Sequence, residues 1–254
     1  MKRSADLDLP GLGGRYDEAL AQALAYLFEQ CEPAAIVITG SIVRGNPDPS
    51  SDLDIFVLHR APWRQRIQRR FAGVPVEFFV NHPDFMQGYF DEDRARGRPT
   101  TAHMLATGHL ALDTNGLMTG FIAASRRMLA AGPQVDEAGL TFRRYETAML
   151  FEDAVDVVDR DPELAAQLLH DAVASALRFC FWRARRWQPR NKELLTALAA
   201  IDPGVATLAR RYYRTHSLDE PHDLAREIIL QTTGETGAFD WETPRDLLPT
   251  NDPS

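Results

Sequence analysis

The chain has little cysteine, almost no lysine and no long apolar run. Its 2 cysteines, Cys31 and Cys180, lie far apart and form no Cys-x-x-Cys pair, which argues against a disulfide framework and against a zinc site. No stretch approaches the ~18 apolar residues that a membrane-spanning helix needs, and no apolar segment follows Lys2 near the N-terminus. We therefore expect a cytoplasmic protein that has no membrane partner.

An excess of positive charge is also missing. The chain carries 36 acidic and 28 basic side chains, and its formal net charge is −8. Proteins that grip long nucleic acids neutralise phosphates with lysine and arginine, so this balance argues against a nucleic-acid partner. Only Lys2 and Lys192 are lysines, which makes Lys192 conspicuous. We expect a small-molecule or protein partner.

What the chain does contain is a compact polar motif between two apolar, β-branched runs. Residues 35–39 lead into Gly40-Ser41-Ile42-Val43-Arg44-Gly45, and residues 51–58 follow a short connection that contains proline. Such runs, bounded by small residues, predict two β-strands. Gly40 would let the backbone approach a phosphate, and Ser41 adds a hydroxyl where a short helix is expected to begin.

Two acids, Asp52 and Asp54, open the second of these strands. Alternate residues of a strand point to the same face, so the two carboxylates project side by side while Leu53 and Ile55 turn to the core. Paired carboxylates can bridge hard cations such as Mg2+. Cations on one side and amide donors on the other suit a nucleoside triphosphate.

Gly-Ser-x-x-Arg-Gly followed by Ser-Asp-Leu-Asp resembles the signature of the DNA polymerase β-like nucleotidyltransferase superfamily. The resemblance covers the first half of the chain and implies a third carboxylate on a following strand. Glu77 is the one acid in the apolar run of residues 74–80. The implied activity is transfer of a nucleoside monophosphate, AMP from ATP, to an acceptor hydroxyl, with release of pyrophosphate.

The resemblance also implies roles for individual residues. Asp52 and Asp54 would hold two Mg2+ ions, and Glu77 would complete the ion on the acceptor side. The nucleotide-binding residues would be Gly40, Ser41 and Ser51 at the phosphates, with Arg44 bracing the loop. The general base stays open between Glu77 and an acid of the second half: Glu146, Glu152 or Asp153.

A domain boundary is predicted at Gly132-Pro133-Gln134, because β-strand signals vanish beyond it. The expected fold class is α+β: a nucleotidyltransferase domain over residues 1–133, with a small mixed sheet and flanking helices, and an all-α bundle over residues 134–254. Apolar spacing and turn residues predict helices in the first domain over residues 15–30, 62–71, 83–96, 103–107 and 117–131. The arginines of residues 62–71 are assigned no role.

The second half predicts helices over residues 137–158, 162–187, 191–200, 203–214 and 218–232. Two of them begin with an Asp-Pro pair, Asp161-Pro162 and Asp202-Pro203, which is typical of an N-cap and a first helical residue.

This arrangement resembles the antibiotic nucleotidyltransferases, including aminoglycoside adenylyltransferases of the kanamycin and streptomycin types. It also resembles proteins whose helical domain is called HEPN-like. In the streptomycin-type enzymes a lysine and a later tyrosine close over the nucleotide phosphates. The matching residues here are Lys192 and Tyr213, with the neighbouring Tyr212 as the alternative.

Three readings of the function follow from these resemblances. The first is nucleotidyl transfer to a small, aminoglycoside-like acceptor. The second is modification of a protein by AMP transfer, and the third is a nucleotide-binding regulatory protein without activity. Acceptor identity, base preference and oligomeric state, including a homodimer, stay open at this point.

Overall fold

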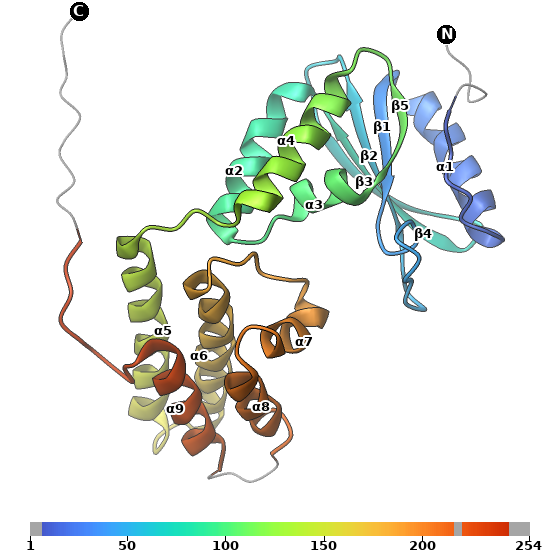
Figure 1. The fold of residues 1–254 in the computed structure, drawn as a ribbon. Coiled ribbons are helices and arrows are strands. Elements are labelled where there is room, and N and C mark those ends of the chain that lie inside the picture. Colours follow the sequence, from blue (N-terminus) through green and yellow to red (C-terminus); the bar gives the residue numbers. More distant parts are fainter. Residues whose placement is uncertain (1–6, 216–219, 244–254) are drawn as a thin grey trace, which may run out of the picture. The chain divides into compact units, whose positions relative to one another are not determined.

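The computed structural model describes residues 7–215 and 220–243. The chain divides into two compact units, Met1–Gly132 and Pro133–Ser254 (Figure 1). The first unit combines a sheet with helices, and the second is helical in its described part. The expected α+β fold class is therefore confirmed.

A five-stranded mixed sheet with the order β3-β4-β2-β1-β5 forms the centre of the first unit. Its strands are β1 (Pro33–Thr39), β2 (Leu53–His59), β3 (Gln65–Phe71), β4 (Val74–Asn81) and β5 (His109–Asp113). β2 and β4 are parallel, whereas every other neighbouring pair is antiparallel. The β1–β2 pairing brings the two halves of the polar motif to the same end of the sheet.

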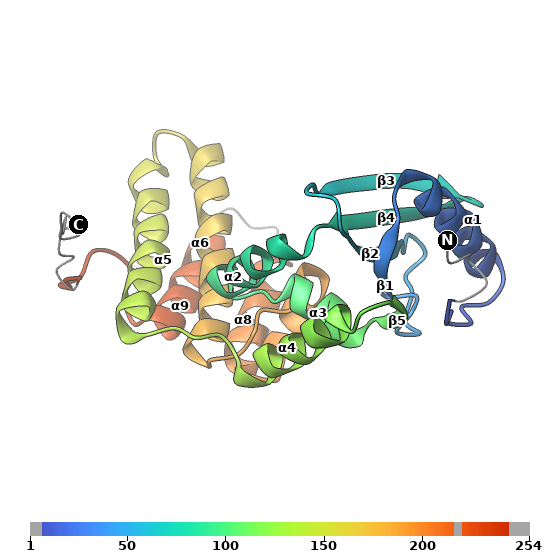
Figure 2. The same cartoon turned by 90° about the horizontal axis from the view of Figure 1, so that it is seen from above.

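Helices cover both faces of this sheet (Figure 2). α1 (Arg15–Gln30) packs its apolar stripe against one face, where side chains of β1, β2 and β4 form the core. On the other face lie α3 (Thr100–Thr107) and α4 (Leu117–Ala131), which contact β1. There the Thr39 hydroxyl donates to the Met104 carbonyl oxygen at 3.0 Å. A 3-10 turn (Pro83–Phe85) leads into α2 (Met86–Arg96).

The helix predicted over residues 62–71 is wrong, because this segment forms the edge strand β3. A two-residue turn at Ala72-Gly73, with φ angles of 45° and 77°, folds the chain back so that β3 and β4 pair antiparallel. Two positive φ angles are typical of the type I′ hairpin turn. The local arginine pattern suggested a helix, but this tight turn and the pairing with β4 override it. Arginines on an edge strand also discourage pairing with other chains.

The second unit contains α5 (Glu137–Val157), α6 (Pro162–Arg183), α7 (Leu194–Ala199), α8 (Pro203–Tyr212) and α9 (Glu220–Thr233). Asp161 and Asp202 cap α6 and α8 as predicted, each accepting a backbone N–H at 3.0 Å. α6 ends before the predicted Trp187, because Arg185 takes a left-handed φ of 51°. The predicted start of the last helix, residue 218, lies outside the described residues.

The core of the second unit forms around α6, whose apolar face meets α5, α8 and α9. Its fully or almost fully buried members include Ala172, Val173, Ala176, Leu177, Phe181, Ala209, Ile228 and Ile229. Across residues 7–215 and 220–243, none of the helices is both long and apolar enough to cross a membrane.

Candidate active site

Three carboxylates meet at one end of the sheet of the first unit. Asp52 lies just before β2, Asp54 lies on β2 and Glu77 lies on β4. One oxygen from each lies within 4.8 Å of the others, and this is the one such group of three found among the described acidic, histidine and cysteine residues. The parallel pairing of β2 with β4 places Asp54 directly beside Glu77.

The strand alternation expected around Asp54 is present. Leu53 and Ile55 are fully buried in the core on the α1 side. Asp54 is paired with Thr39, whose hydroxyl contacts α3, so its carboxylate lies on the opposite face of the sheet. All three acids are half-buried, which leaves their oxygens partly accessible.

The electrostatics of this group favour the binding of cations. Burial first, and then the negative charges of Asp52 and Glu77, raise the pKa of Asp54 to about 7, although Arg44 and Arg66 oppose the shift. A bound cation would offset the repulsion among the three acids and would favour the ionised form of Asp54. Carboxylate oxygens are the ligands that Mg2+ takes in proteins, so the donor set fits this ion.

The loop after β1 is packed against these acids. Gly40 has a φ of 103°, and a β-carbon there would lie 3.0 Å from Asp54 Oδ2. The hydroxyls of Ser41 and Ser51 are 2.7 Å apart, and Ser51 Oγ also accepts the Asp48 N–H at 2.8 Å. This hydrogen bond ties together Ser41 and Ser51, which are ten positions apart in sequence.

The short helix expected at Ser41 is wrong, because residues 41–45 form turns. The Gly45 N–H donates to the Ile42 carbonyl oxygen at 3.1 Å, and the Asn46 N–H donates to that of Ser41 at 3.0 Å. Gly45, with a φ of 76°, and Pro47, two residues later, stop any further helical turn. The loop therefore lacks the dipole of a helix N-terminus, and the Gly45 and Asn46 amides are used within the turn.

Arg66, on the edge strand β3, is the residue of this site that the sequence did not reveal. Its Nε–H donates to Glu77 Oε1, and its guanidinium lies 4.7 Å from the centroid of the Phe79 ring. The missed signal was the Ala-Gly turn at residues 72–73, because a hairpin there puts residues 65–71 beside β4.

Two further residues expected at the site, Lys192 and Tyr213, belong to the second unit, whereas the carboxylates belong to the first. Lys192 is exposed in a 3-10 turn (Asn191–Glu193). Tyr213 is 44% exposed at the end of α8, whereas Tyr212 is 3% exposed. The Tyr212 hydroxyl lies 3.1 Å from His170 Nδ1, so this buried hydroxyl has a hydrogen-bonding partner.

The acids of α5 differ in their surroundings. Glu152 Oε2 accepts the Ala238 N–H at 2.7 Å and is half-buried under the segment that follows α9. Glu146 and Asp153 are exposed. Glu152 is thus committed to a structural contact, while the other two carboxylates remain at the surface.

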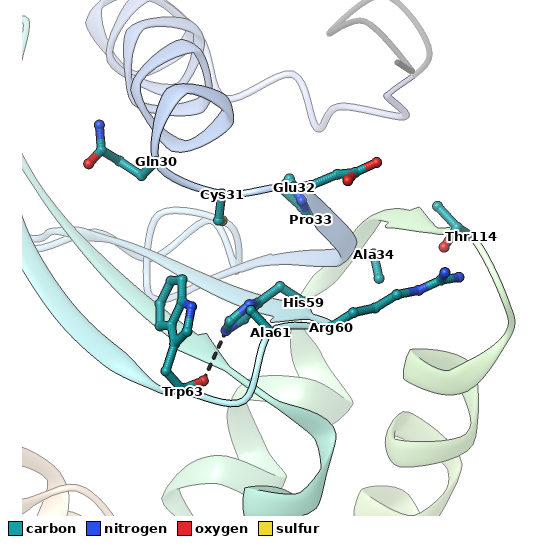
Figure 3. A pocket seen from close by; sticks show the side chains of 10 residues that line it. All are labelled: Gln30, Cys31, Glu32, Pro33, Ala34, His59, Arg60, Ala61, Trp63 and Thr114. Carbon is teal, nitrogen blue, oxygen red and sulfur yellow. Dashed lines mark hydrogen bonds between the residues drawn. The ribbon is translucent and has the colours of Figure 1, made fainter.

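A separate cavity of about 480 Å³ lies at the far end of β1 and β2 (Figure 3). His59 and Trp63 form one wall, where His59 Nε2 donates to the Trp63 carbonyl oxygen at 3.0 Å. Pro33 and His59 stand at the opposite ends of their strands from Gly40 and Asp54, roughly 20 Å away at the rise of a strand. This cavity therefore takes no part in the carboxylate site.

Comparison with known proteins points to one family. Residues 18–100 match the family model described as a nucleotidyltransferase domain, a segment that contains Asp52, Asp54 and Glu77. The chain is similar to the crystal structure of a nucleotidyltransferase-like protein from Exiguobacterium sibiricum 255-15, with a TM-score of 0.54 and 13% identity over 86% of this chain and 74% of that chain. At this identity the likeness shows the fold. No curated protein sequence matches the chain.

Proposed function

Because its first unit carries a nucleotidyltransferase domain of the DNA polymerase β-like superfamily, we propose that this protein transfers AMP from ATP to a hydroxyl of a small-molecule acceptor and releases pyrophosphate. The observation that carries this proposal is the meeting of Asp52, Asp54 and Glu77, whose oxygens lie within 4.8 Å of one another.

In this proposal Asp52 and Asp54 would bind both Mg2+ ions, and Glu77 would complete the ion on the acceptor side. Two such ions, when bound, stabilise the entering and leaving oxygens of an in-line displacement at phosphorus. Asp54 must give up its proton for this, and its raised pKa of about 7 makes binding dependent on pH. The pairing of β2 with β4 keeps Asp54 and Glu77 side by side.

The loop residues would bind the triphosphate. Ser41 and Ser51 present linked hydroxyls, and Gly40, without a side chain, lets the loop pack against Asp54. Arg44 would brace the loop, and its positive charge already acts on Asp54. From the second unit, Lys192 and Tyr213 would contact the phosphates. Such contact requires exposed side chains, and both residues are exposed.

The proton of the acceptor hydroxyl would pass to Glu77, the carboxylate on the acceptor side. Among the acids of α5, Glu152 is held by the Ala238 N–H, so Glu146 and Asp153 are the alternatives. Either would act from the helical unit, to which we assign the binding of the acceptor.

The acceptor that we propose to test first is an aminoglycoside-like compound. The formal net charge of −8 would attract a molecule that carries several amino groups. We place the reaction in the cytoplasm, because Cys31 and Cys180 are free thiols.

The experiment is a measurement of pyrophosphate release from each of the four NTPs with Mg2+, with and without aminoglycosides or a small-molecule cell extract. We expect release that requires both ATP and an acceptor, and the mass of the adduct identifies the acceptor. Asp52→Ala should abolish release. Glu29→Ala is the matched control, because Glu29 is an exposed acid on α1, on the other face of the sheet.

Release that survives Asp52→Ala, or that occurs equally in EDTA, would contradict the metal-dependent transfer. Absence of release with every acceptor, together with binding of ATP and Mg2+ in a thermal-shift assay, would replace the small molecule with a protein acceptor. Failure to bind any nucleotide would contradict the proposed function as a whole.

A further inference from the structure

The third carboxylate of the site already has a positively charged partner. Arg66 Nε–H donates to Glu77 Oε1, and the side chains are 67% and 16% exposed, respectively. Glu77 is thus held by a guanidinium at the water-accessible side of the carboxylate group. An ion pair with one mostly buried partner is screened less than a surface pair and therefore matters more for the charge of the site.

The position of Arg66 follows from the register of the edge strand. Arg66 lies opposite Phe79 and Gln68 lies opposite Glu77, so side chains 66, 68 and 70 share the face of the carboxylates. Arg69 points to the other face, where its guanidinium lies 4.9 Å from the centroid of the Tyr26 ring of α1. The Phe79 ring supports the guanidinium of Arg66 and directs it toward Glu77.

Arg66 also acts on the rest of the group. Its side chain lies on the face of the sheet that carries the three carboxylates, and it contacts one of them directly. In the absence of metal, Arg66 therefore offsets part of the repulsion among three neighbouring carboxylates. When divalent cations bind, the same charge becomes unfavourable, because the guanidinium then lies beside additional positive charge.

We propose that Arg66 is a positioning residue that competes with the acceptor-side metal for Glu77, so that this metal binds well only after a nucleotide has bound. The inference rests on the proposed role of Glu77 as a metal ligand. The negative charge of a bound triphosphate gives the displaced guanidinium a new partner on the same face of the sheet. Nucleotide and acceptor-side metal thus favour each other's binding, with a coupling that depends on Arg66.

The test measures metal affinity without turnover. Mn2+ is titrated into the full-length protein and free Mn2+ is followed by EPR, first alone and then with α,β-methylene-ATP, which cannot release pyrophosphate. The variants are Arg66→Gln, which removes the charge, and Arg66→Lys, which retains it. Arg70→Gln is the matched control, because Arg70 lies on the same strand and face but donates to the Gly73 carbonyl oxygen at 3.3 Å.

For Arg66→Gln we expect the Kd for Mn2+ without nucleotide to fall by about five- to tenfold, within the usual range of coupling between sites. With the nucleotide analogue, the difference from wild type should shrink to less than about twofold, because the triphosphate already holds Arg66 away from Glu77. Arg66→Lys and Arg70→Gln should both behave like the wild type.

An unchanged or weaker Mn2+ affinity in Arg66→Gln would overturn the competition, since it would mean that Arg66 holds Glu77 ready for the metal. An equal gain of Mn2+ affinity in Arg70→Gln would show that the effect comes from the overall charge, and it would also overturn the proposed competition. Failure of the wild type and all variants to bind Mn2+ would overturn the metal site itself. A tighter Arg66→Gln variant in a protein that releases no pyrophosphate would support the competition and contradict only the transfer reaction.

Discussion

Gly40 and Asp54 are packed so closely that a β-carbon at residue 40 would lie 3.0 Å from Oδ2 of Asp54. The same glycine has a φ of 103°, a conformation that residues with a side chain rarely adopt. The first glycine of the loop is therefore required twice, once by the backbone and once by the carboxylate beside it.

Gly40→Ala should lower the rate of pyrophosphate release by more than about tenfold, because the added methyl group displaces the Asp54 carboxylate by a few tenths of an ångström. Gly45→Ala is the control, since Gly45 also has a positive φ, 76°, but has open space around its α-carbon. Both variants should lose about 1–2 kcal/mol of stability in urea unfolding, and only Gly40→Ala should lose activity. Equal activities of the two variants would contradict the steric argument.

The metal-free protein should lose stability as the pH rises from about 4 to 7. Burial first, and then Asp52 and Glu77, raise the pKa of Asp54 from 3.8 to about 7. The folded chain keeps a proton there that the unfolded chain has lost, so unfolding becomes easier with rising pH across this window. We would measure the free energy of unfolding in urea with EDTA present. The value for Asp54→Asn should rise relative to that of the wild type as the pH rises, by about 1–3 kcal/mol at pH 8.

Saturating Mg2+ should reverse this order at pH 8, because an asparagine offers no charge to the metal. A difference between wild type and Asp54→Asn that does not change with pH would show that Asp54 titrates normally.

Substitutions of Tyr212 and Tyr213 should affect different properties, stability in the first case and nucleotide binding in the second. Tyr212→Phe removes a buried hydroxyl that lies 3.1 Å from His170 Nδ1, so we expect a loss of about 1 kcal/mol in the free energy of unfolding and an unchanged KM for ATP. Tyr213→Phe should leave stability unchanged, since this residue is 44% exposed, and should raise the KM for ATP several-fold. An unchanged KM in Tyr213→Phe would remove Tyr213 from the proposed nucleotide site.

A substitution at Ala72, in the hairpin turn between β3 and β4, should stabilise the protein. Its φ of 45° is unfavourable for alanine, whereas asparagine followed by glycine is the preferred pair for this turn. Ala72→Asn should therefore raise the free energy of unfolding by about 0.5–1 kcal/mol. Gly73→Ala, which places a side chain at a φ of 77°, should lower it. An unchanged or lower free energy of unfolding in Ala72→Asn would contradict the assigned turn.

Local signals in the sequence were sufficient for most elements. α4 begins and ends at the residues predicted, Leu117 and Ala131, and the aspartate caps of α6 and α8 are present. Such signals act over a few residues, because a helix needs only a cap, an apolar stripe and a stop. The side-by-side placement of Asp52 and Asp54 is local in the same sense, since it follows from the alternation of a strand.

Features that join distant segments were decided by the tertiary structure. β3 became a strand because the turn at residues 72–73 returned it to β4, against its helical pattern. The alignment of Glu77 with Asp54 depends on the parallel pairing of β2 and β4, for which the sequence carried only the family resemblance.

The amino-acid sequence alone thus determined that two acids face a nucleotide-binding type of loop, because a strand and a turn set that geometry within some fifteen residues. Only the tertiary structure decided that Arg66 holds the third carboxylate. Its guanidinium reaches Glu77 through the register of an edge strand, and register is set by backbone pairing across the sheet.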